Sequence, residues 1–473
     1  MKRLITPLLL ALAVGSLGAK VRPASIVTSD MVLQQQTDAR LWGKADPGEK
    51  VTVSTSWDGR TYTAVTDRTG DWSLAVKTPK ASFTPYYIEI AGSDNLPRRL
   101  DNVLIGEVWL ASGQSNMQMP LKGFPGCIVE GGYDEIASAG KEAGKVRFAT
   151  LPLVQSYEPL DTVDTRWVVP SPETAPEFSA LAWHFAKRMS DVLGVPVGIV
   201  SAAYGGAKVE SWSPREMVGK YSDISLDPKD IEAETHYLRP YLMYNAMFNP
   251  VRGYTYKGII WYQGCSNVDS YATYPERLAA MVQRWRDDIG LGEIPFYTVE
   301  VAPYDYGSGN GPLIREAQHK AVALIPNSDI ISTNDLVKPY ERFNIHPSDK
   351  ATAGKRLCDL ALNKTYGRKQ FLAGSPTVKG VNFRDGEAWV AIDSPNMGVC
   401  SNYDIRGFEV AGADRVFHPA DSVRLHWQTN EAVVSSKEVP EPVAVRYCWG
   451  DFAPGTLYGG NHLPLIPWRS DNW

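Results

Sequence analysis

The stretch VLIGEVWLASGQSNM, residues 103–117, decides how the middle of the chain folds. Residues 103–110 are mostly apolar, with Gly106 and Glu107 as the interruptions, which is typical of a buried strand. Small residues follow and predict a tight turn, so the side chain presented at the carboxyl edge of the sheet is that of Ser115. We therefore treat Ser115 as a candidate nucleophile. Taken alone, a turn or helix-capping serine is the more common role, because the G-x-S-x-G elbow is absent.

Outward from this stretch, residues 103–365 alternate between apolar runs and segments with apolar residues at helical spacing. Alternation of this length implies an α/β domain with a parallel sheet and helices on both faces. The patterns predict strands at 196–201, 258–262, 295–301 and 329–332, and helices at 178–193, 278–289, 313–324 and 349–362.

Both flanks of this domain have β character. Residues 20–102 contain short alternating runs separated by turn signals such as Asp46-Pro47-Gly48, which predicts a β-sandwich. Residues 366–473 return to the same pattern and predict a second β region. A chain of 473 residues is also too long for one ordinary core. We therefore expect three domains: 20–102, 103–365 and 366–473.

The N-terminus has the pattern of a secretory signal peptide over residues 1–19. Lys2 and Arg3 precede the apolar run 4–17, and small residues follow. No later stretch approaches the ~18 uninterrupted apolar residues that a membrane span needs. The sequence thus predicts a periplasmic or secreted protein without a membrane span.

Composition excludes some classes of partner and site. The net charge of −5 gives no basic footprint for nucleic acid. Five cysteines leave room for one disulfide in an oxidising compartment, while the lack of any C-x-x-C pair argues against structural zinc. The cysteines are Cys127, Cys265, Cys358, Cys400 and Cys448.

Polar motifs follow several predicted strands, at Ser115, Gly205-Gly206 and Asn267, and a fourth contains His346 before the last helix. The carboxyl ends of parallel strands share one edge, so these motifs should converge. A serine nucleophile needs a base, and histidine, with a pKa near ~6.5, can supply one. Glycine N–H groups and an asparagine amide can stabilise an oxyanion. Each residue alone has a commoner role in a turn, a cap or the surface. Their conjunction indicates acyl transfer.

The motifs that carry this conjunction resemble those of the sialate O-acetylesterase group of the SGNH hydrolases. They are GQSNM (113–117), GGAKVESW (205–212), WYQGCSN (261–267), IREAQ (314–318) and NIHPSDKATAGKRL (344–357). The resemblance implies an SGNH-hydrolase-like domain that needs no metal or organic cofactor. It assigns Ser115 as the nucleophile and His346 as the general base.

The same resemblance implies an oxyanion hole, and two further residues are candidates for binding the substrate. The backbone N–H groups of Ser115 and Gly206 and the amide of Asn267 would form the oxyanion hole. Gln114 and Arg315 are the candidates for substrate binding, Arg315 because an acidic sugar would favour a nearby guanidinium. A solvated helix residue or a structural ion pair is the alternative for Arg315.

Two positions depart from the family pattern. Family members usually carry Glu where this chain has Cys265, which makes this thiol a rival nucleophile, although a structural role is commoner. SGNH enzymes often place Asp three residues before the histidine, and here that residue is Phe343, while the residue two before is Asn344, an amide that cannot supply a negative charge. The triad acid is therefore unassigned. The candidates are Glu341, Asp335 and Asp349, or a backbone carbonyl that orients His346 in a dyad.

These observations predict a secreted carbohydrate O-acetylesterase, with sialic acids as the substrate class by resemblance only. A deacetylase of a plant polysaccharide such as xylan is an alternative, because the same chemistry serves both. A glycan-binding protein with a decayed hydrolase site is another, given the departures at Cys265 and Asn344 and the 14 Trp and 23 Tyr residues. The exact sugar, the acetyl position and the oligomeric state stay open.

Overall fold

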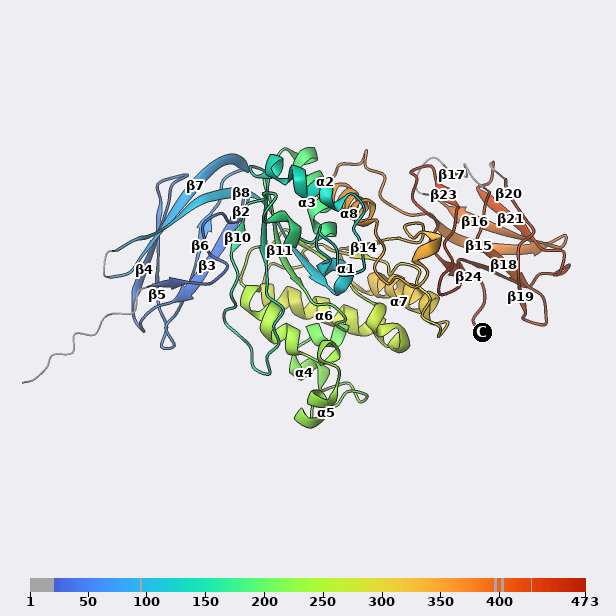
Figure 1. Ribbon diagram of the computed structural model, residues 1–473, viewed down its shortest axis with the longest axis horizontal. Helices are drawn as coiled ribbons and strands as arrows, with labels where there is room; N and C mark the ends of the chain where they lie inside the picture. Colours follow the sequence, from blue (N-terminus) through green and yellow to red (C-terminus); the bar gives the residue numbers. More distant parts are fainter. Residues whose placement is uncertain (1–20, 94–95, 395–397, 401–403, 427) are drawn as a thin grey trace, which may run out of the picture.

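The computed structural model describes residues 21–473 except 94–95, 395–397, 401–403 and 427. The predicted signal peptide, residues 1–19, lies outside the described residues. Figure 1 shows three parts along the long axis: N-terminal strands, a central domain of helices around a sheet, and C-terminal strands.

The central sheet has the strand order β10-β9-β11-β8-β12-β13-β14. Every neighbouring pair from β9 to β14 is parallel, and only the short edge strand β10 runs antiparallel. The strands are β8 (Arg98–Gly113), β9 (Val146–Thr150), β10 (Trp167–Val168), β11 (Val197–Ala203), β12 (Gly258–Tyr262), β13 (Phe296–Val299) and β14 (Ser328–Ile331). The predicted parallel sheet is thus confirmed, and β12 has the predicted bounds.

Helices cover both faces of this sheet, as predicted. On β8, Val108 and Leu110 belong to the apolar core beneath α6 and α7, whereas Trp109 and Ala111 belong to the core beneath α3 and α8. Because successive side chains of a strand point to opposite faces, a strand buried on both sides reads as a continuous apolar run. The helices are α1 (Ser115–Gln118), α2 (Gly132–Ser138), α3 (Ala180–Leu193), α4 (Arg215–Val218), α5 (Pro228–Ala233), α6 (Tyr274–Ile289), α7 (Gly311–Leu324) and α8 (Lys350–Lys364).

The N-terminal region is joined to the central sheet by β8 itself. The first half of this 16-residue strand pairs with β7 and β2, and its second half pairs with β11 and β12. The domain boundary expected at residue 102 therefore falls inside a continuous strand. The other strands of this region are β1 (Arg22–Pro23), β2 (Val32–Gln34), β3 (Asp38–Lys44), β4 (Lys50–Thr55), β5 (Thr61–Val65), β6 (Asp71–Lys77) and β7 (Ser82–Ala91).

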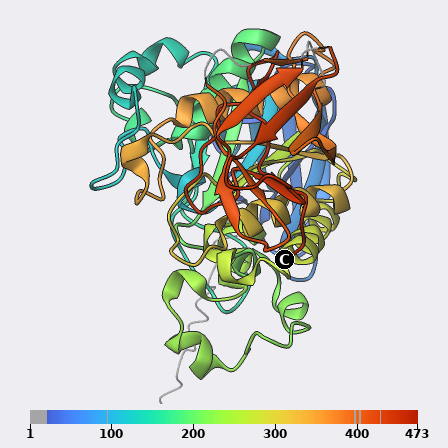
Figure 2. The same cartoon turned by 90° about the vertical axis from the view of Figure 1, so that its right-hand side faces the viewer.

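The C-terminal region packs two antiparallel sheets, β15-β16-β21-β20 and β19-β18-β22-β24, around one apolar core. Figure 2 shows these strands in front of the central domain. The strands are β15 (Thr377–Arg384), β16 (Glu387–Asp393), β17 (Val399–Cys400), β18 (Phe408–Ala411), β19 (Phe417–Pro419), β20 (Ser422–His426), β21 (Glu431–Ser435), β22 (Ala444–Tyr447), β23 (Tyr458–Gly459) and β24 (Trp468–Arg469).

Two expectations from composition can be compared with this fold. All five cysteines lie in the described part of the chain and all are free thiols, so the structure contains no disulfide among them. Among the described residues, no helix is both long and apolar enough to cross a membrane.

The interruptions of the central strand, Gly106 and Glu107, have structural causes. A side chain on Gly106 would overlap the backbone carbonyl of Pro196, to which the Glu107 N–H donates at 2.9 Å. The buried Glu107 carboxylate accepts from Gln34, Gln35 and Tyr366. Glycine permits the close approach of strands here, and the carboxylate joins the N-terminal region to the end of α8.

We expect Gly106→Ala to lower the free energy of unfolding by about 1–3 kcal/mol, because overpacking forces the backbone of β8 away from Pro196. Urea unfolding followed by tryptophan fluorescence measures the change. Gly140→Ala is the matched control, because a Cβ there meets no atom within 4 Å. Equal stability of both variants would contradict the packing described for β8.

Candidate active site

The turns after β11, β8 and β12 meet at one edge of the sheet. The Tyr204 N–H donates to the Gly113 carbonyl at 3.1 Å, and the Gln114 N–H donates to the Tyr262 carbonyl at 2.9 Å. The Gln114 side chain continues this link, because its Oε1 accepts from the Gly264 N–H at 2.9 Å. The convergence predicted from the strand pattern is confirmed.

Ser115 is the first residue of α1 and is half-buried at the centre of this edge. The chain reaches it through Gly113, whose φ is 136° and whose absent side chain leaves room for the Tyr262 backbone. Gln114 is 2% exposed, and its side-chain Oε1 already accepts a hydrogen bond from the Gly264 N–H. A contact between Gln114 and substrate stays a prediction.

The Gly205-Gly206 turn lies directly against the serine. A Cβ built on Gly205 would lie 3.6 Å from the Ser115 Cβ, and the Gly205 N–H donates to Gln118 Oε1 at 2.7 Å. Gly206 has a φ of 77°, and the ring of Tyr237 packs where its side chain would be. Glycine is required at Gly206 for both reasons. The N–H of Gly205 is engaged, which leaves that of Gly206 as the candidate oxyanion donor of this turn.

Asn267 follows β12, as predicted, and is fully buried. Its Oδ1 accepts from the Val209 N–H at 3.1 Å and from Gln263 Nε2 at 2.7 Å. Its Nδ2 donates to Glu210 at 3.0 Å and to Ser270 at 3.2 Å. The structure therefore shows Asn267 holding the two neighbouring turns together. A further donation from this amide to an oxyanion stays a prediction.

The loop that contains His346 is tied to the serine turn through Asn116. Asn116 Nδ2 donates to the Ile345 carbonyl at 3.0 Å, and Asn116 Oδ1 accepts from Lys350 Nζ at 2.6 Å. Within its own loop, the His346 N–H donates to Asn344 Oδ1 at 3.0 Å. The residues beside Ser115 and His346 in the sequence are thus in direct contact.

The imidazole of His346 lies in apolar surroundings, with the ring of Phe124 at 5.3 Å, edge to face. Burial, followed by the positive charge of Lys350, lowers the pKa of His346 to about 4. Its Nε2 is buried and has no hydrogen-bond partner in the described part of the chain. At neutral pH this histidine is uncharged, and its Nε2 makes no hydrogen bond to Ser115 Oγ.

Each carboxylate proposed as the triad acid has other partners. Glu341 accepts from the backbone N–H groups of Lys338 at 2.8 Å and Ser348 at 2.9 Å. Asp335 forms a bidentate ion pair with Arg356, with both N···O distances at 2.7 Å. Asp349 is the N-cap of α8, where its side chain accepts from the Thr352 N–H. Within the described residues, none of the three is hydrogen-bonded to the His346 ring.

Cys265, the rival nucleophile, is 6% exposed. Burial raises the pKa of its thiol, although the charge of Lys350 acts in the opposite direction. The thiolate is the nucleophilic form of cysteine, and a raised pKa keeps the thiol protonated. This favours Ser115 over Cys265 as the nucleophile.

The structure corrects the expectation for Arg315. This side chain is fully buried, and its guanidinium donates to the carbonyl oxygens of Gly450 at 2.5 Å and of Cys448 and Asp451 at 3.4 Å. It fastens α7 to the C-terminal region instead of contacting an acidic sugar. The helical motif IREAQ could not show that Arg315 would pack against the C-terminal region.

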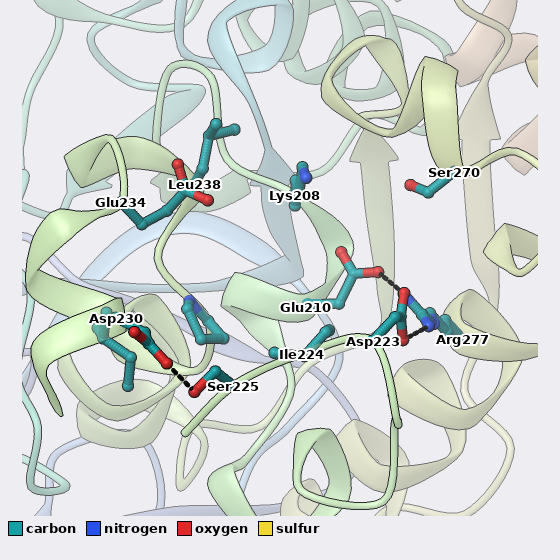
Figure 3. A pocket seen from close by; sticks show the side chains of 12 residues that line it. Lys208, Glu210, Asp223, Ile224, Ser225, Asp230, Glu234, Leu238, Ser270 and Arg277 are labelled. Atoms are coloured by element: carbon teal, nitrogen blue, oxygen red, sulfur yellow. Dashed lines mark hydrogen bonds and ion pairs between the residues drawn. The ribbon is translucent and has the colours of Figure 1, made fainter. Parts of the chain in front are cut away.

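Figure 3 shows a polar pocket of about 190 Å³, whose lining includes the two residues that Asn267 Nδ2 contacts, Glu210 and Ser270. Arg277 bridges Glu210 at 2.7 Å and Asp223 at 2.5 Å on one side of it. Lys208, two residues after Gly206, also lines the pocket and makes no ion pair among the described residues. The pocket is completed by Ile224, Ser225, Asp230, Ile231, Glu234, Leu238, Pro240 and Ser270.

Sequence reasoning gave no role to Asn116, Lys350 or Tyr237. The sequence could have indicated Lys350, because a positive charge in the first turn of a helix interacts unfavourably with the helix dipole. Tyr237 comes from the segment containing α4 and α5, which projects from the central domain (Figures 1 and 2) and has no clear sequence pattern. In the described residues, no three His, Cys, Asp or Glu side chains lie together as metal ligands would.

Comparison with known proteins places this geometry in a family. The family model described as "Carbohydrate esterase, sialic acid-specific acetylesterase" matches residues 105–363, from β8 to α8. The chain is 30% identical to a sialate O-acetylesterase of Mus musculus over 445 residues, which cover 80% of this chain and 79% of the relative. The sialate O-acetylesterase of Homo sapiens is 29% identical over 413 residues, covering 79% and 76%.

The fold is also similar to a solved structure. The crystal structure of a carbohydrate acetylesterase from Xanthomonas citri superposes with a TM-score of 0.84 at 30% identity, covering 96% of this chain and 100% of that one. The match includes the flanking β regions as well as the central domain. The chain therefore belongs to the carbohydrate esterase family of sialic acid-specific acetylesterases.

Proposed function

We propose that the protein is a serine esterase that removes O-acetyl groups from sialic acids. The observation that carries this proposal is the contact of Asn116 with Ile345, which joins the serine turn to the histidine loop. Family membership supports the substrate class, because the curated relatives are named sialate O-acetylesterases. An SGNH-hydrolase-like arrangement of the central domain is part of the same proposal.

The reaction has two steps. Ser115 Oγ attacks the acetyl carbonyl while His346 accepts the serine proton, and His346 then gives this proton to the leaving sugar oxygen as the sugar–acetyl bond breaks. In the second step His346 takes a proton from water as the water attacks the acetyl-serine, and it then returns this proton to Ser115 Oγ as the bond between Oγ and the acetyl carbon breaks, which releases acetate and free Ser115. In the structure the His346 Nε2 is buried and makes no hydrogen bond to Ser115 Oγ, so the first step requires the imidazole to move toward the hydroxyl.

The developing negative charge on the acetyl oxygen needs donors that are already in place. The backbone N–H groups of Ser115 and Gly206 are suited to this, because the Gly205 N–H is engaged by Gln118 and Gly206 is held in its turn by Tyr237. The proposed oxyanion hole consists of these two groups, with Asn267 holding the turns that supply them.

We propose a Ser115–His346 dyad without a carboxylate. The three candidate acids are engaged by backbone amides, by Arg356 or by the first turn of α8. The backbone of the His346 loop is instead held by Asn344 and Asn116. These contacts hold the backbone from which the imidazole extends.

The pocket in Figure 3 is the proposed place for the sugar beyond its acetyl group. An acidic sugar needs a nearby cation, and Arg277 is already paired with two carboxylates. Lys208 is the other cation of the pocket, where its charge acts on Asp223 among four carboxylates, those of Glu210, Asp223, Asp230 and Glu234. We therefore assign contact with the sugar carboxylate to Lys208 in place of the buried Arg315.

The N-terminal pattern of residues 1–19 supports export, with cleavage near residues 18–20. The substrate would then be met in the periplasm or outside the cell.

We expect purified protein to release acetate from O-acetylated sialic acid faster than from acetylated xylan, and Ser115→Ala to lower kcat by at least about 10³-fold. Ser54→Ala, on the N-terminal sheet, is the matched control and should keep full activity. An acetate assay on both substrates measures this.

Each other outcome of this assay has a definite meaning. Faster release from xylan would identify a polysaccharide deacetylase. Inactivity of the folded protein on every acetyl ester would favour a glycan-binding protein. An active Ser115→Ala variant would contradict the assigned nucleophile.

The pH dependence should reflect the low pKa of His346. The base acts in its neutral form, so kcat/KM should hold down to about pH 5 and fall as the pH passes through about 4, below the 6.5 of an ordinary histidine. Initial rates of acetate release across this range give the midpoint, and recovery of activity after return to neutral pH excludes unfolding. A midpoint near 6.5 would contradict the described environment of the imidazole.

Lys208→Gln should lower kcat/KM for O-acetylated sialic acid by about 5- to 10-fold and leave that for the neutral ester 4-nitrophenyl acetate unchanged, because only the former carries a carboxylate. Lys220→Gln, an exposed lysine outside the pocket, is the control. Equal losses on both esters would show that Lys208 supports the turn and not charge recognition.

A further inference from the structure

A lysine is buried next to the reacting groups without a carboxylate bound to it. Lys350, the first residue of α8, is 2% exposed, and its Nζ donates to Asn116 Oδ1 at 2.6 Å. Within the described residues it makes no ion pair. A buried ammonium is costly unless it is paired, so its retention in this place calls for a role.

The partner of Lys350 is the residue that joins the two halves of the site. Asn116 is 1% exposed, and its other amide atom donates to the Ile345 carbonyl at 3.0 Å. A lysine can only donate and a backbone carbonyl can only accept. The two contacts therefore fix which way the amide points, and Lys350 keeps the donor of Asn116 directed at the histidine loop.

Five titratable groups from other parts of the site interact electrostatically with this lysine. They are Glu341 from the turn before the histidine loop, Asp349 at the cap of α8, Cys265 after β12, Cys127 from the loop before α2, and His346 itself. Burial lowers the pKa of Lys350 to about 7, against the effect of Glu341. The Glu341 oxygens accept backbone N–H groups, so this carboxylate influences Lys350 without bonding to it.

Cys265 is a further buried neighbour of Lys350. It is near enough for its own charge and that of Lys350 to influence each other's pKa. The charge of Lys350 is one of the two causes of the low pKa of the His346 imidazole.

We propose that Lys350 is a positioning residue of the esterase reaction, which holds Ser115 and His346 together through the Asn116 amide. This inference rests on the function proposed above for those two residues. It assigns Lys350 no contact with substrate and no covalent step.

The first test is Lys350→Met, which removes the charge and keeps the length. We expect kcat for acetate release to fall by about 10- to 100-fold with little change in KM, because the reacting groups lose their alignment. The acidic limb of the pH profile should also move upward from about 4 toward 6.5, because a positive charge near His346 has gone. A lysine that influenced His346 only through its charge would move this limb without lowering kcat at neutral pH.

A double-mutant cycle tests the route through Asn116. If Lys350 acts by holding this amide, Asn116→Ala together with Lys350→Met should lower kcat no more than the more damaging of the two single changes. Losses that multiply would show independent roles and overturn the inference.

A second variant keeps the test decisive if Lys350→Met does not fold. Cys265→Glu places a carboxylate beside Lys350 and offsets its charge, so the acidic limb should move upward in this variant as well. Cys265→Ser is the matched control and should leave the limb in place. Wild-type kcat in folded Lys350→Met, or in Asn116→Ala if the lysine variant does not fold, would refute the inference, while the wild-type protein and Ser115→Ala still test the proposed function.

Discussion

The pairing of β8 with β11 on one side and β12 on the other is the constraint on which the site depends. Parallel register brings the ends of the three strands level, and the backbone bonds from Tyr204 to Gly113 and from Gln114 to Tyr262 close the turns against each other. The serine, the paired glycines and the asparagine thus reach one edge although they lie far apart in the sequence. The same strand extends into the N-terminal sheet, so the serine turn is anchored by two regions of the protein.

The histidine arrives by a different route. It lies on a loop outside the sheet, and side chains hold it in place: Asn116 contacts the carbonyl before it, and Asn344 accepts its N–H. Burial and the nearby Lys350 keep the imidazole neutral. An imidazole with this low pKa is a weaker base than an ordinary histidine.

Much of the central domain could be predicted because its strands are buried on both faces and therefore read as apolar runs. β12 has the predicted bounds, and α3 ends at Gly194, which has the left-handed conformation expected of a capping glycine. The true start of β8 could not be predicted, because residues 98–102 belong to an exposed part of the N-terminal sheet, where apolar periodicity is weak.

The parts of the site that sequence reasoning missed depend on contacts between distant segments. Arg315 was expected to be exposed to substrate, yet it is enclosed by carbonyls of the C-terminal region, which no helical spacing reveals. Asn116 was visible within the serine motif, but its function depends on the Ile345 carbonyl and on Lys350. Tyr237 packs on Gly206 from a projecting segment whose place over the turn is set by tertiary structure alone.

The central claim is that Ser115 is the reacting nucleophile of a site assembled by this convergence. Labelling of the active protein with a fluorophosphonate, followed by mass spectrometry of its peptides, tests this most directly. The account predicts one adduct, on Ser115, with loss of acetate release in proportion to labelling. An adduct on Cys265 or on any other residue, formed as activity is lost, would contradict it.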